Sequence, residues 1–392
     1  MVVKKAGLWK IDGVEVKRTS TSSSVKCLCP PLDMSTPSGL DLAHLLPPTT
    51  LTRLAQDWLA EDVTHFDPAG MCVGAGPQTA TLLCKEPGSV LAGVPFFNAV
   101  FGVLGCQVDW LYPEGAELGP EQVTRVAVVH GPARNILLGE RSALNCLARA
   151  SGIATRGRQL ASVARKAAWK GSVAGTRKTT PGFRLVEKYA MLVGGVATHR
   201  CDLSSLVMLK DNHVWACGGI AQAVQDVRQV CGFSSKIEVE CRSEDEGREA
   251  ARAGADIVML DNFTPQVSHH PREVKRSTWL ATHPPVLFVS QTLHTVARTL
   301  KQDFPSVLIE ASGGITPETL SAFFSPSVDI ISLGCITQGC PVVDFSLKIQ
   351  CPQRSHSGTA RRENGVPCGT VDDHGITTVP SGPPAARRDF AF

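Results

Sequence analysis

The stretch Val173-Ala-Gly-Thr-Arg-Lys-Thr-Thr-Pro-Gly-Phe-Arg184 joins a short apolar run to two adjacent cations and a helix-start signal. Thr180 and Pro181 are typical of an N-cap and of the first turn of a helix. Arg177 and Lys178 therefore lie at a strand-to-helix junction, where cations are costly to bury and unnecessary for folding. An ordinary solvated loop pair explains two cations alone, but the arrangement recurs along the chain and indicates a polyanionic ligand.

Apolar runs that end in a polar or charged group recur after Gly171, and a helix pattern follows each of them. Continuous apolar strands that alternate with helices are typical of a parallel sheet covered by helices. Functional groups at the carboxyl ends of such strands favour a barrel of the TIM type. The groups at the expected strand ends are Lys210, Glu240, Asp261, Glu310 to Gly314, and Ser332 to Gly334.

The helices between these strands carry boundary signals. Ser243 with Glu246 forms a capping box, and Gly254 is expected to end the same helix. Thr316 and Pro317 are expected to open another helix.

The interval from Asp261 to Ser312 is nearly long enough for two strand–helix units but holds a single helix pattern. The surplus, residues 266–291, has no amphipathic face and is expected to form a surface insertion. Its end, Pro284 to Gln291, is typical of a translated pyrimidine tract and splice acceptor, so retained intron sequence is a hypothesis for its origin.

Mixed helix and strand patterns over residues 39–150 predict a compact domain before a barrel domain at 151–348. Residues 1–38 contain a Ser/Thr run, and residues 349–392 are rich in Pro, Gly and Arg. Both ends lack hydrophobic periodicity, so we expect a disordered extension and a disordered tail.

The helix pattern that begins near Leu137 places a cation on an apolar stripe. Leu137, Leu144 and Ala148 share one helix face, and Arg141 falls on the same face. The arginine either extends its head to water or points into a site, which another subunit can complete.

The composition is that of an ordinary globular protein, because 43% of the 392 residues are hydrophobic and 19% are charged. A net charge of +3 is too small to indicate nucleic acid, and no apolar segment predicts a signal peptide or a membrane span. The 14 cysteines lie scattered through apolar stretches without a C-x-x-C pair. We therefore expect reduced cysteines in a cytoplasmic protein, with neither disulfides nor a zinc site.

Convergence of the strand ends predicts one cavity with cations on one side and carboxylates on the other. Glu240 and Asp261 suit Mg²⁺, which prefers a few carboxylates plus substrate phosphate oxygens, and they equally suit stabilisation of an oxocarbenium. A structural ion pair is the alternative for either acid alone. His199 by itself is more typical of a structural histidine, but beside Arg200 it is a candidate for ligand contact. The expected cations are Arg177, Lys178, His199, Arg200 and Lys210.

Two glycine-rich turns follow the last two expected strands of the barrel. Ser312-Gly-Gly314 and Ser332-Leu-Gly334 offer backbone N–H groups at expected helix N-termini. Two such turns in consecutive terminal units of a barrel indicate a phosphate site.

Several motifs occur together in one order along the chain. They are Gly175 to Arg184, His199-Arg200, Leu209 to His213, Glu238-Val-Glu240, Leu260-Asp-Asn262, Glu310 to Ile315 and Gly139 to Asn145. Over roughly Gly39 to Lys348, without the insertion, the chain resembles the quinolinate phosphoribosyltransferases. The resemblance implies an N-terminal α/β sandwich domain followed by an open TIM-like α/β barrel, the type II phosphoribosyltransferase fold.

The resemblance also implies an activity. A phosphoribosyl group would pass from phosphoribosyl pyrophosphate to the nitrogen of quinolinate, with release of pyrophosphate. Loss of CO₂ would then give nicotinate mononucleotide. This reaction is a step of de novo NAD biosynthesis. Mg²⁺ is the implied cofactor. The implied assembly is a homodimer with shared sites, which some members build into a hexamer.

Carried onto this sequence, the resemblance implies a role for each candidate residue. Arg141 would be delivered across the dimer interface. The carboxylates of quinolinate and neighbouring phosphates would be bound by Arg177, Lys178, His199, Arg200 and Lys210. Ribose and Mg²⁺ would be bound by Glu240 and Asp261, and the 5′-phosphate by Ser312, Gly313, Gly314 and Gly334. The implied catalytic residues are Lys178, Lys210, Glu240 and Asp261.

Two other functions stay open at this level. A Schiff-base aldolase fits a lysine at a barrel strand end, such as Lys210, but leaves the arginines without a role. A catalytically inactive ligand-binding subunit is the second alternative, because the insertion begins shortly after Asp261.

Overall fold

The computed structural model forms two units, residues 1–32 and 33–392. The residues that it describes are 9–11, 14–16, 41–265 and 292–350. In the first unit, β1 (Trp9–Ile11) pairs antiparallel with β2 (Val14–Val16), although the sequence predicts no structure there. The predictions of disorder at both termini and of a surface insertion at 266–291 otherwise lie outside the described residues.

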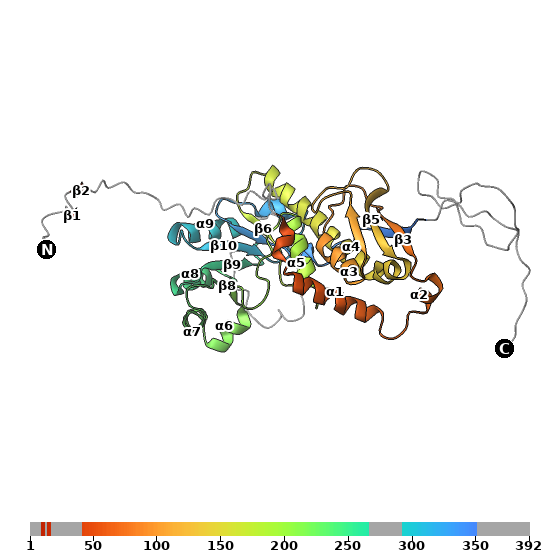
Figure 1. Cartoon of the computed structure of the whole chain (residues 1–392). Helices are drawn as coiled ribbons and strands as arrows, with labels where there is room; N and C mark the ends of the chain where they lie inside the picture. The colour runs from red at the N-terminus through yellow and green to blue at the C-terminus, as the bar shows by residue number, and fades with distance from the viewer. Residues whose placement is uncertain (1–8, 12–13, 17–40, 266–291, 351–392) are drawn as a thin grey trace, which may run out of the picture. The chain divides into compact units, whose positions relative to one another are not determined.

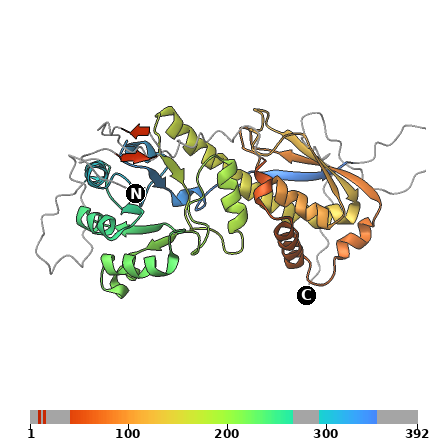
Figure 2. The ribbon, with the colours of Figure 1, turned by 60° about the vertical axis from the view of Figure 1, so that its left-hand side comes forward.

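A four-stranded antiparallel sheet in the order β12-β3-β5-β4 forms one domain of the second unit (Figures 1 and 2). Its strands are β3 (Pro77–Cys84), β4 (Gln107–Trp110), β5 (Thr124–Pro132) and β12 (Phe345–Ile349). Side chains alternate between the two faces of a strand, so β3 buries Ala80, Leu82 and Cys84. One face of this sheet therefore contributes to a hydrophobic core.

Three helices share that core with the sheet: α1 (Pro48–Asp62), α3 (Val94–Val103) and α4 (Ala133–Lys166). Helix α3 is apolar on most of its surface, and Phe96, Phe97 and Phe101 are fully buried. The short elements η1 (Leu42–Leu45) and α2 (Pro68–Val73) complete this part of the chain. The expected α/β sandwich is confirmed, with helices packed on a sheet.

Two elements near the predicted domain boundaries contribute to both domains. Strand β12 pairs with β3, so residues 345–348, the end of the segment predicted as the barrel domain, contribute a strand to the sheet of the sandwich. Helix α4 continues through the predicted boundary at residue 150, with Leu147 in the sandwich core and Ile153 in the barrel core. One helix therefore joins the two cores.

A six-stranded parallel sheet in the order β6-β11-β10-β9-β8-β7 forms the second domain. Its strands are β6 (Ser172–Ala174), β7 (Val207–Leu209), β8 (Ile237–Cys241), β9 (Ile257–Asp261), β10 (Leu308–Ser312) and β11 (Ile330–Ser332). Strands β6 and β7 are the edges of this sheet, and a parallel bridge from Ala174 to Ala197 extends the β6 side. The expected open TIM-like barrel is confirmed.

Helices alternate with these strands as the sequence predicts. They are α5 (Arg184–Val193), α6 (Asp211–Cys217), α7 (Ile220–Cys231), α8 (Glu244–Ala253) and α9 (Leu293–Asp303), with the 3₁₀ turns η3 (Leu320–Phe323) and η4 (Gly334–Ile336). Ser243 caps α8 by accepting a hydrogen bond from the Glu246 N–H, and Gly254 ends the helix at φ 99°. Over the described residues, none of the helices has both the length and the apolarity to cross a membrane.

Two predicted helix starts are wrong. Helix α5 begins at Arg184, because Thr180 directs both its N–H and its hydroxyl to Glu187 and does not cap the helix. Thr316 and Pro317 open no α-helix, and the chain there forms turns that lead into η3. In both places side-chain contacts of the loop replace the regular helical turn.

Gly152 allows α4 to approach the chain that leads into β12, since a Cβ at this position would meet the carbonyl oxygen of Pro341. We expect Gly152→Ala to lower the free energy of unfolding by about 1–3 kcal/mol through overpacking. Gly102→Ala is the matched control, because Gly102 is an exposed helical residue whose added Cβ would meet nothing within 4 Å. Its alanine should leave stability unchanged or raise it by up to about 1 kcal/mol. Denaturant unfolding of both variants measures the difference, and equal stabilities would contradict the close approach.

Candidate active site

A cavity of about 610 Å³ opens at the carboxyl ends of the barrel strands. It collects the side chains that the sequence places at strand ends, since parallel strands present their carboxyl ends on one side of a sheet. Predicted residues that line it are Arg177, Lys178, His199, Arg200, Lys210, Glu240, Asp261, Ser312, Gly313, Gly314 and Gly334. Further lining residues are Thr176, Met208, Met259, Asn262, Glu310, Ile315, Ser332, Cys335 and Gln338.

One side of the cavity is positively charged. Burial and then the charge of Arg177 lower the pKa of Arg200, which shows that the two guanidinium groups act on each other. The Nε atom of Arg177 is buried and has no hydrogen-bond partner among the described residues. Like charges in a partly dry cavity repel each other, so this side is suited to an anion with several charges.

Carboxylates line the other side. Lys210 forms an ion pair with Glu240 through its Nζ atom. Burial and then the charge of Glu240 raise the pKa of Asp261, while the Asn262 side-chain amide donates to Asp261. A divalent cation relieves such repulsion between neighbouring carboxylates, and the oxygen atoms of Glu240 and Asp261 match the ligands of Mg²⁺. The Lys210 amine, which a Schiff-base aldolase would use as its nucleophile, is thus bound to a carboxylate.

The glycine turns have the backbone freedom that close approach of a phosphate requires. Gly313 has φ 97° and Gly314 has φ 61°, and a Cβ at Gly313 would meet the side chain of Asn262. The prediction of helix N-termini behind both turns is wrong in part. Gly334 opens only the 3₁₀ turn η4, and η3 begins at Leu320, several residues after Gly314.

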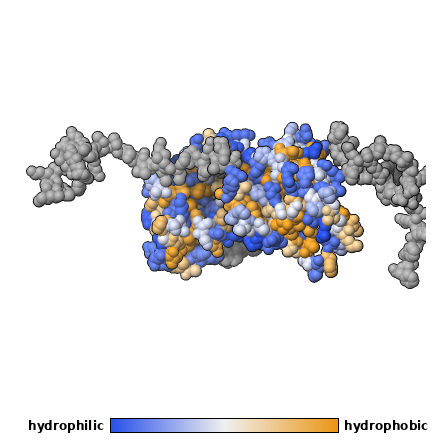
Figure 3. All heavy atoms as spheres, viewed as in Figure 1, coloured by the Kyte–Doolittle hydropathy of each residue, from blue (hydrophilic) through white to orange (hydrophobic). Residues whose placement is uncertain are grey.

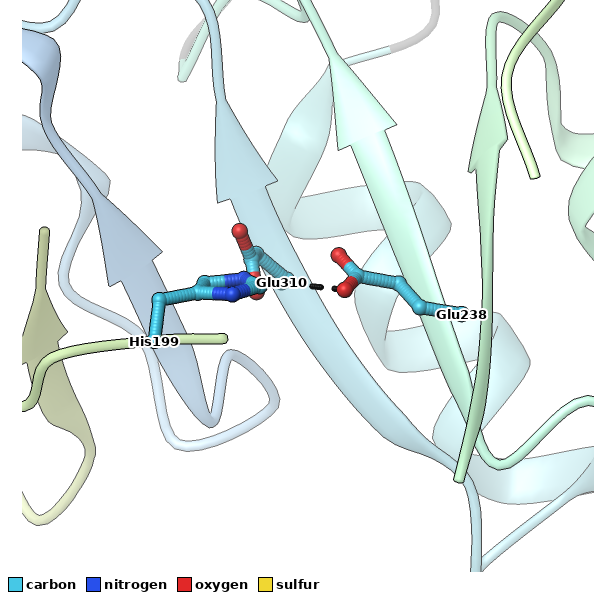
Figure 4. A group of neighbouring side chains, drawn as sticks. All are labelled: His199, Glu238 and Glu310. Carbon is cyan, nitrogen blue, oxygen red and sulfur yellow. Dashed lines mark hydrogen bonds and ion pairs between the residues drawn. The ribbon is translucent and has the colours of Figure 1, made fainter. Parts of the chain in front are cut away.

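A buried acidic pair lies beneath the cavity and was not assigned a role from the sequence. Glu238 and Glu310 are 0% exposed, and both approach the His199 ring (Figure 4). His199 Nε2 lies 3.1 Å from Glu310 Oε2 and 3.6 Å from Glu238 Oε2. Burial and then the charge of Glu310 raise the pKa of Glu238 well above its usual range.

Sequence periodicity offered a signal for these two acids. Residues two apart in a strand share a face, so Glu238 lies on the face of Glu240 in β8, and Glu310 on that of Ser312 in β10. His199 is placed with the cations by the sequence, but its ring is paired with Glu310 and not with a cation.

The loop that carries Arg177 and Lys178 is held by a buried ion pair. Glu187 on α5 is 0% exposed and accepts hydrogen bonds from the Arg149 guanidinium and from both the N–H and the hydroxyl of Thr180. Since Arg149 lies on α4, this contact connects the loop to the helix that joins both cores. The positions of the cations are therefore fixed by groups behind the cavity.

Lys188, the next residue of α5, holds a second loop. It is 3% exposed, and its Nζ donates to the carbonyl oxygens of Thr198 and Arg200. Burial, then the nearby cations Arg184 and Arg177, lower the pKa of Lys188 to about 8. Burial of this ammonium costs free energy, but its hydrogen bonds fix the loop that presents Arg200.

Arg141 does not join the other candidates. It is exposed on α4 and lines a separate cavity of about 510 Å³ together with residues of α1 and the 180–183 turn. The prediction of an apolar stripe around it is wrong in part, because Leu137 is 39% exposed although Leu144 is buried. Within one chain, Arg141 therefore lies outside the site that the strand ends form.

Fold and site together define a barrel enzyme that binds a phosphorylated and carboxylated ligand at the carboxyl ends of its strands. Family models of quinolinate phosphoribosyl transferase match the chain, the N-terminal domain over residues 69–151 and the C-terminal domain over residues 153–348. The chain belongs to the quinolinate phosphoribosyltransferase family.

Relatives and solved structures agree with this family. The chain is 53% identical over 308 residues to human nicotinate-nucleotide pyrophosphorylase [carboxylating], covering 79% of this chain and 94% of that protein. It is 46% identical over 324 residues to the Dictyostelium discoideum protein of the same name, covering 79% and 99%. The nicotinate-nucleotide pyrophosphorylase structure from Francisella tularensis superposes with a TM-score of 0.65 at 31% identity, covering 79% of this chain and 100% of that one.

Removal of the Lys188 amine should change how stability depends on pH. The folded-state pKa of Lys188 lies below the usual 10.5, so between about pH 8 and 10.5 the unfolded chain binds more protons than the folded chain. We expect the stability of the wild type relative to Lys188→Met to rise across this range, by about 1–3 kcal/mol. Urea unfolding at pH 8 and pH 10 measures it. A difference between the two proteins that is constant with pH would contradict the lowered pKa.

Proposed function

We propose that this chain carries out phosphoribosyl transfer from phosphoribosyl pyrophosphate to quinolinate with loss of CO₂, a step of NAD biosynthesis. Nicotinate mononucleotide and pyrophosphate are the other products, and the enzyme is a carboxylating phosphoribosyltransferase. The observation that carries this assignment is the gathering of Arg177, Lys178, Arg200 and Lys210 around one cavity in a chain of this family. A pyridine dicarboxylate and a pyrophosphorylated sugar together supply the negative charge that these cations require.

The cations have two tasks in this proposal. Arg177 and Arg200 hold the two carboxylates of quinolinate, because a guanidinium binds a carboxylate with two parallel hydrogen bonds. Bound in this way, the ring nitrogen faces the anomeric carbon, and pyrophosphate departs as the new C–N bond forms. The same positive charges, with Lys178, stabilise the negative charge that remains on the ring carbon when CO₂ leaves.

Glu240 and Asp261 are the proposed ligands of Mg²⁺. Their support is the coupling between the two carboxylates, whose mutual repulsion a divalent cation neutralises. Bound Mg²⁺ would supply charge neutralisation for the pyrophosphate leaving group. Lys210 pairs with Glu240 and thereby keeps one carboxylate oriented toward the cavity.

The 5′-phosphate is assigned to Ser312, Gly313, Gly314 and Gly334. Support comes from the positive φ angles of the two central glycines, which free backbone N–H groups for an anion, and from their place on the cavity wall. Ser332 donates a hydrogen bond to the Ser312 hydroxyl at 3.1 Å, which orients that hydroxyl on the same wall.

Arg141 is assigned to the site of a second subunit in a homodimer, which can assemble further into a hexamer. The separate location and exposure of Arg141 support this sharing. Large apolar residues are also exposed next to α4, since Phe66 is 90% and Met71 89% exposed at α2, which packs on α4. The face in Figure 3 mixes hydrophilic and hydrophobic residues, as is usual for a protein surface.

A cytoplasmic location is part of the same proposal. Its support is chemical, because the ten cysteines in the described part of the chain are all free thiols.

Loss of one guanidinium from the cavity tests the proposed function. We expect Arg177→Ala to reduce quinolinate-dependent release of pyrophosphate by about 10²–10⁴-fold in the presence of Mg²⁺. Arg125→Ala is the matched control, since Arg125 is an exposed arginine on β5 that lines neither cavity. Wild-type turnover in both variants would remove the assignment of the cavity. Quinolinate binding without any turnover of the wild-type chain would instead support a ligand-binding subunit.

Sharing of sites between subunits predicts complementation. Arg141→Ala and Arg177→Ala should each be inactive alone, but their co-expression should restore about a quarter of wild-type activity. The reason is that half of the barrels retain Arg177, and half of those receive an intact Arg141 from a partner chain. Turnover per total chain in the unselected co-expressed protein gives the fraction, and co-purification of a sample through two different affinity tags verifies that mixed oligomers form. Absence of any recovery in verified mixed oligomers would place Arg141 in the site of its own chain.

A further inference from the structure

The segment that presents Arg200 to the cavity has a strained backbone. His199 has φ 56°, in the left-handed region that costs free energy for a residue with a Cβ. Such a conformation persists only where surrounding contacts fix it, and buried groups hold both His199 and Arg200.

The ring of His199 is engaged through both nitrogen atoms. The N–H of Arg200 donates to His199 Nδ1 at 2.7 Å, which requires an unprotonated Nδ1. The ring proton must then lie on Nε2, which is 3.1 Å from Glu310 Oε2 (Figure 4). Geometry alone therefore selects the neutral tautomer with the proton on Nε2, and Glu310 is its acceptor.

The carbonyl oxygen of Arg200 is held from a different direction. Lys188 Nζ donates to it at 3.1 Å and also to the carbonyl oxygen of Thr198. Consequently both backbone groups of Arg200 bind buried or nearly buried side chains, the N–H through His199 and the C=O through Lys188. This arrangement clamps the peptide of a residue whose guanidinium lines the cavity.

We infer that Glu310 is a positioning residue for the reaction, which fixes the His199 ring and through it the backbone of Arg200. The inference rests on the proposed function, because it assigns Arg200 to a carboxylate of quinolinate. Glu310 acts through His199 and is not proposed to touch either substrate. Glu238 lies on β8, which β9 separates from β10, and its Oε2 is 3.6 Å from His199 Nε2.

A purely structural role does not explain this acid. Glu310 is 0% exposed at the cavity, and its second carboxylate oxygen has no hydrogen-bond partner among the described residues. Replacement of a whole buried ionic cluster by apolar side chains of similar volume is often neutral or stabilising. The free-energy cost of burying Glu310 is explained if this carboxylate orients a functional residue, as the buried partners of catalytic histidines do.

A metal ion is a weaker explanation of the same cluster. The nearest ligand atoms of His199, Glu238 and Glu310 lie within 4.8 Å of one another, which is close enough for a cation. However, the positive charges of Arg200 and Lys210 already act on Glu238. The same charges would repel a divalent cation bound beside this carboxylate. His199 Nε2 is also satisfied by Glu310 without a metal.

Two substitutions at Glu310 separate positioning from folding. Glu310→Leu removes the acceptor but keeps an apolar volume, so we expect a folded protein whose KM for quinolinate rises at least about 10-fold. The KM for phosphoribosyl pyrophosphate should change less than about 3-fold. Glu310→Gln retains an oxygen that can accept the Nε2–H bond, and it should recover most of the quinolinate affinity.

Asp329→Asn is the matched control in the same barrel. Asp329 directly precedes β11, accepts a hydrogen bond from the Ile309 N–H at 2.7 Å and pairs with Lys301, at the opposite end of the strands from the cavity. We expect this variant to lose stability while both KM values stay at the wild-type level. Equal effects of Glu310→Leu and Asp329→Asn on both KM values would overturn the inference, because general loosening of the barrel would then account for them.

A spectroscopic readout makes the test independent of turnover. In ¹⁵N-histidine-labelled protein, with His199→Gln used for assignment, the wild type should show an unprotonated Nδ1 and a protonated Nε2 for His199. Glu310→Leu should shift these signals, whereas Asp329→Asn should not. Unchanged His199 signals in Glu310→Leu would overturn the inference. A wild-type chain without quinolinate-dependent turnover would contradict the proposed function alone. The ¹⁵N signals of the His199 ring would still report whether Glu310 fixes the ring.

Discussion

Repulsion among cations is the constraint on which the architecture of this site depends. Arg177, Lys178, Arg200 and Lys210 come from three separate segments and meet at one cavity. Bringing like charges together costs free energy unless opposite charges or a rigid frame oppose them. Both are present, because Glu240 pairs directly with Lys210, and buried groups behind the cavity fix the loops that carry the arginines.

Helix α5 supplies the frame through two consecutive buried residues of opposite charge. Glu187 accepts hydrogen bonds from the loop that carries Arg177, and Lys188 donates to the loop that carries Arg200. Arg149 extends the first contact, since its guanidinium also donates to the carbonyl oxygens of Thr337 and Cys340. Consequently α4, α5 and the chain leading into β12 are fastened at one point, and movement of any one of them would displace the cations.

The strand ends and helix caps could be predicted from the sequence because their signals are local. Apolar runs with charged ends identified the barrel strands, and Ser243 with Gly254 marked the limits of α8. The pairing of β12 with β3 could not be predicted in this way, because the alternating pattern of Phe345 to Ile349 fits the edge of any sheet. Nor does the local signal at Thr180 reveal that Glu187, seven residues later, captures its side chain.

The sequence predicted most residues that line the barrel cavity, but it did not predict the roles of the buried acids Glu238 and Glu310. Strand periodicity places Glu238 and Glu310 on the inner face of the barrel, yet it cannot show that they meet the ring of His199. That meeting depends on the curvature of the sheet and on the left-handed backbone at His199, neither of which has a sequence signature for a histidine. The role of a charged residue inside a barrel strand therefore depends on the side chains that its face of the sheet contacts, and its neighbours in sequence do not reveal them.

Helix α4 explains why one chain does not hold all the candidate cations. Its buried side is mostly apolar, with Leu147 in one core and Ile153 in the other, so a cation without a buried acidic partner such as the Glu187 of Arg149 lies on the exposed side. Arg141 occupies that exposed side and lines its own cavity. The same helix that fixes the rear of the barrel site through Arg149 thus presents Arg141 away from it. A partner chain that covers this face would give Arg141 an anion to bind, and the proposed sharing of sites follows from the position of one helix between two cores.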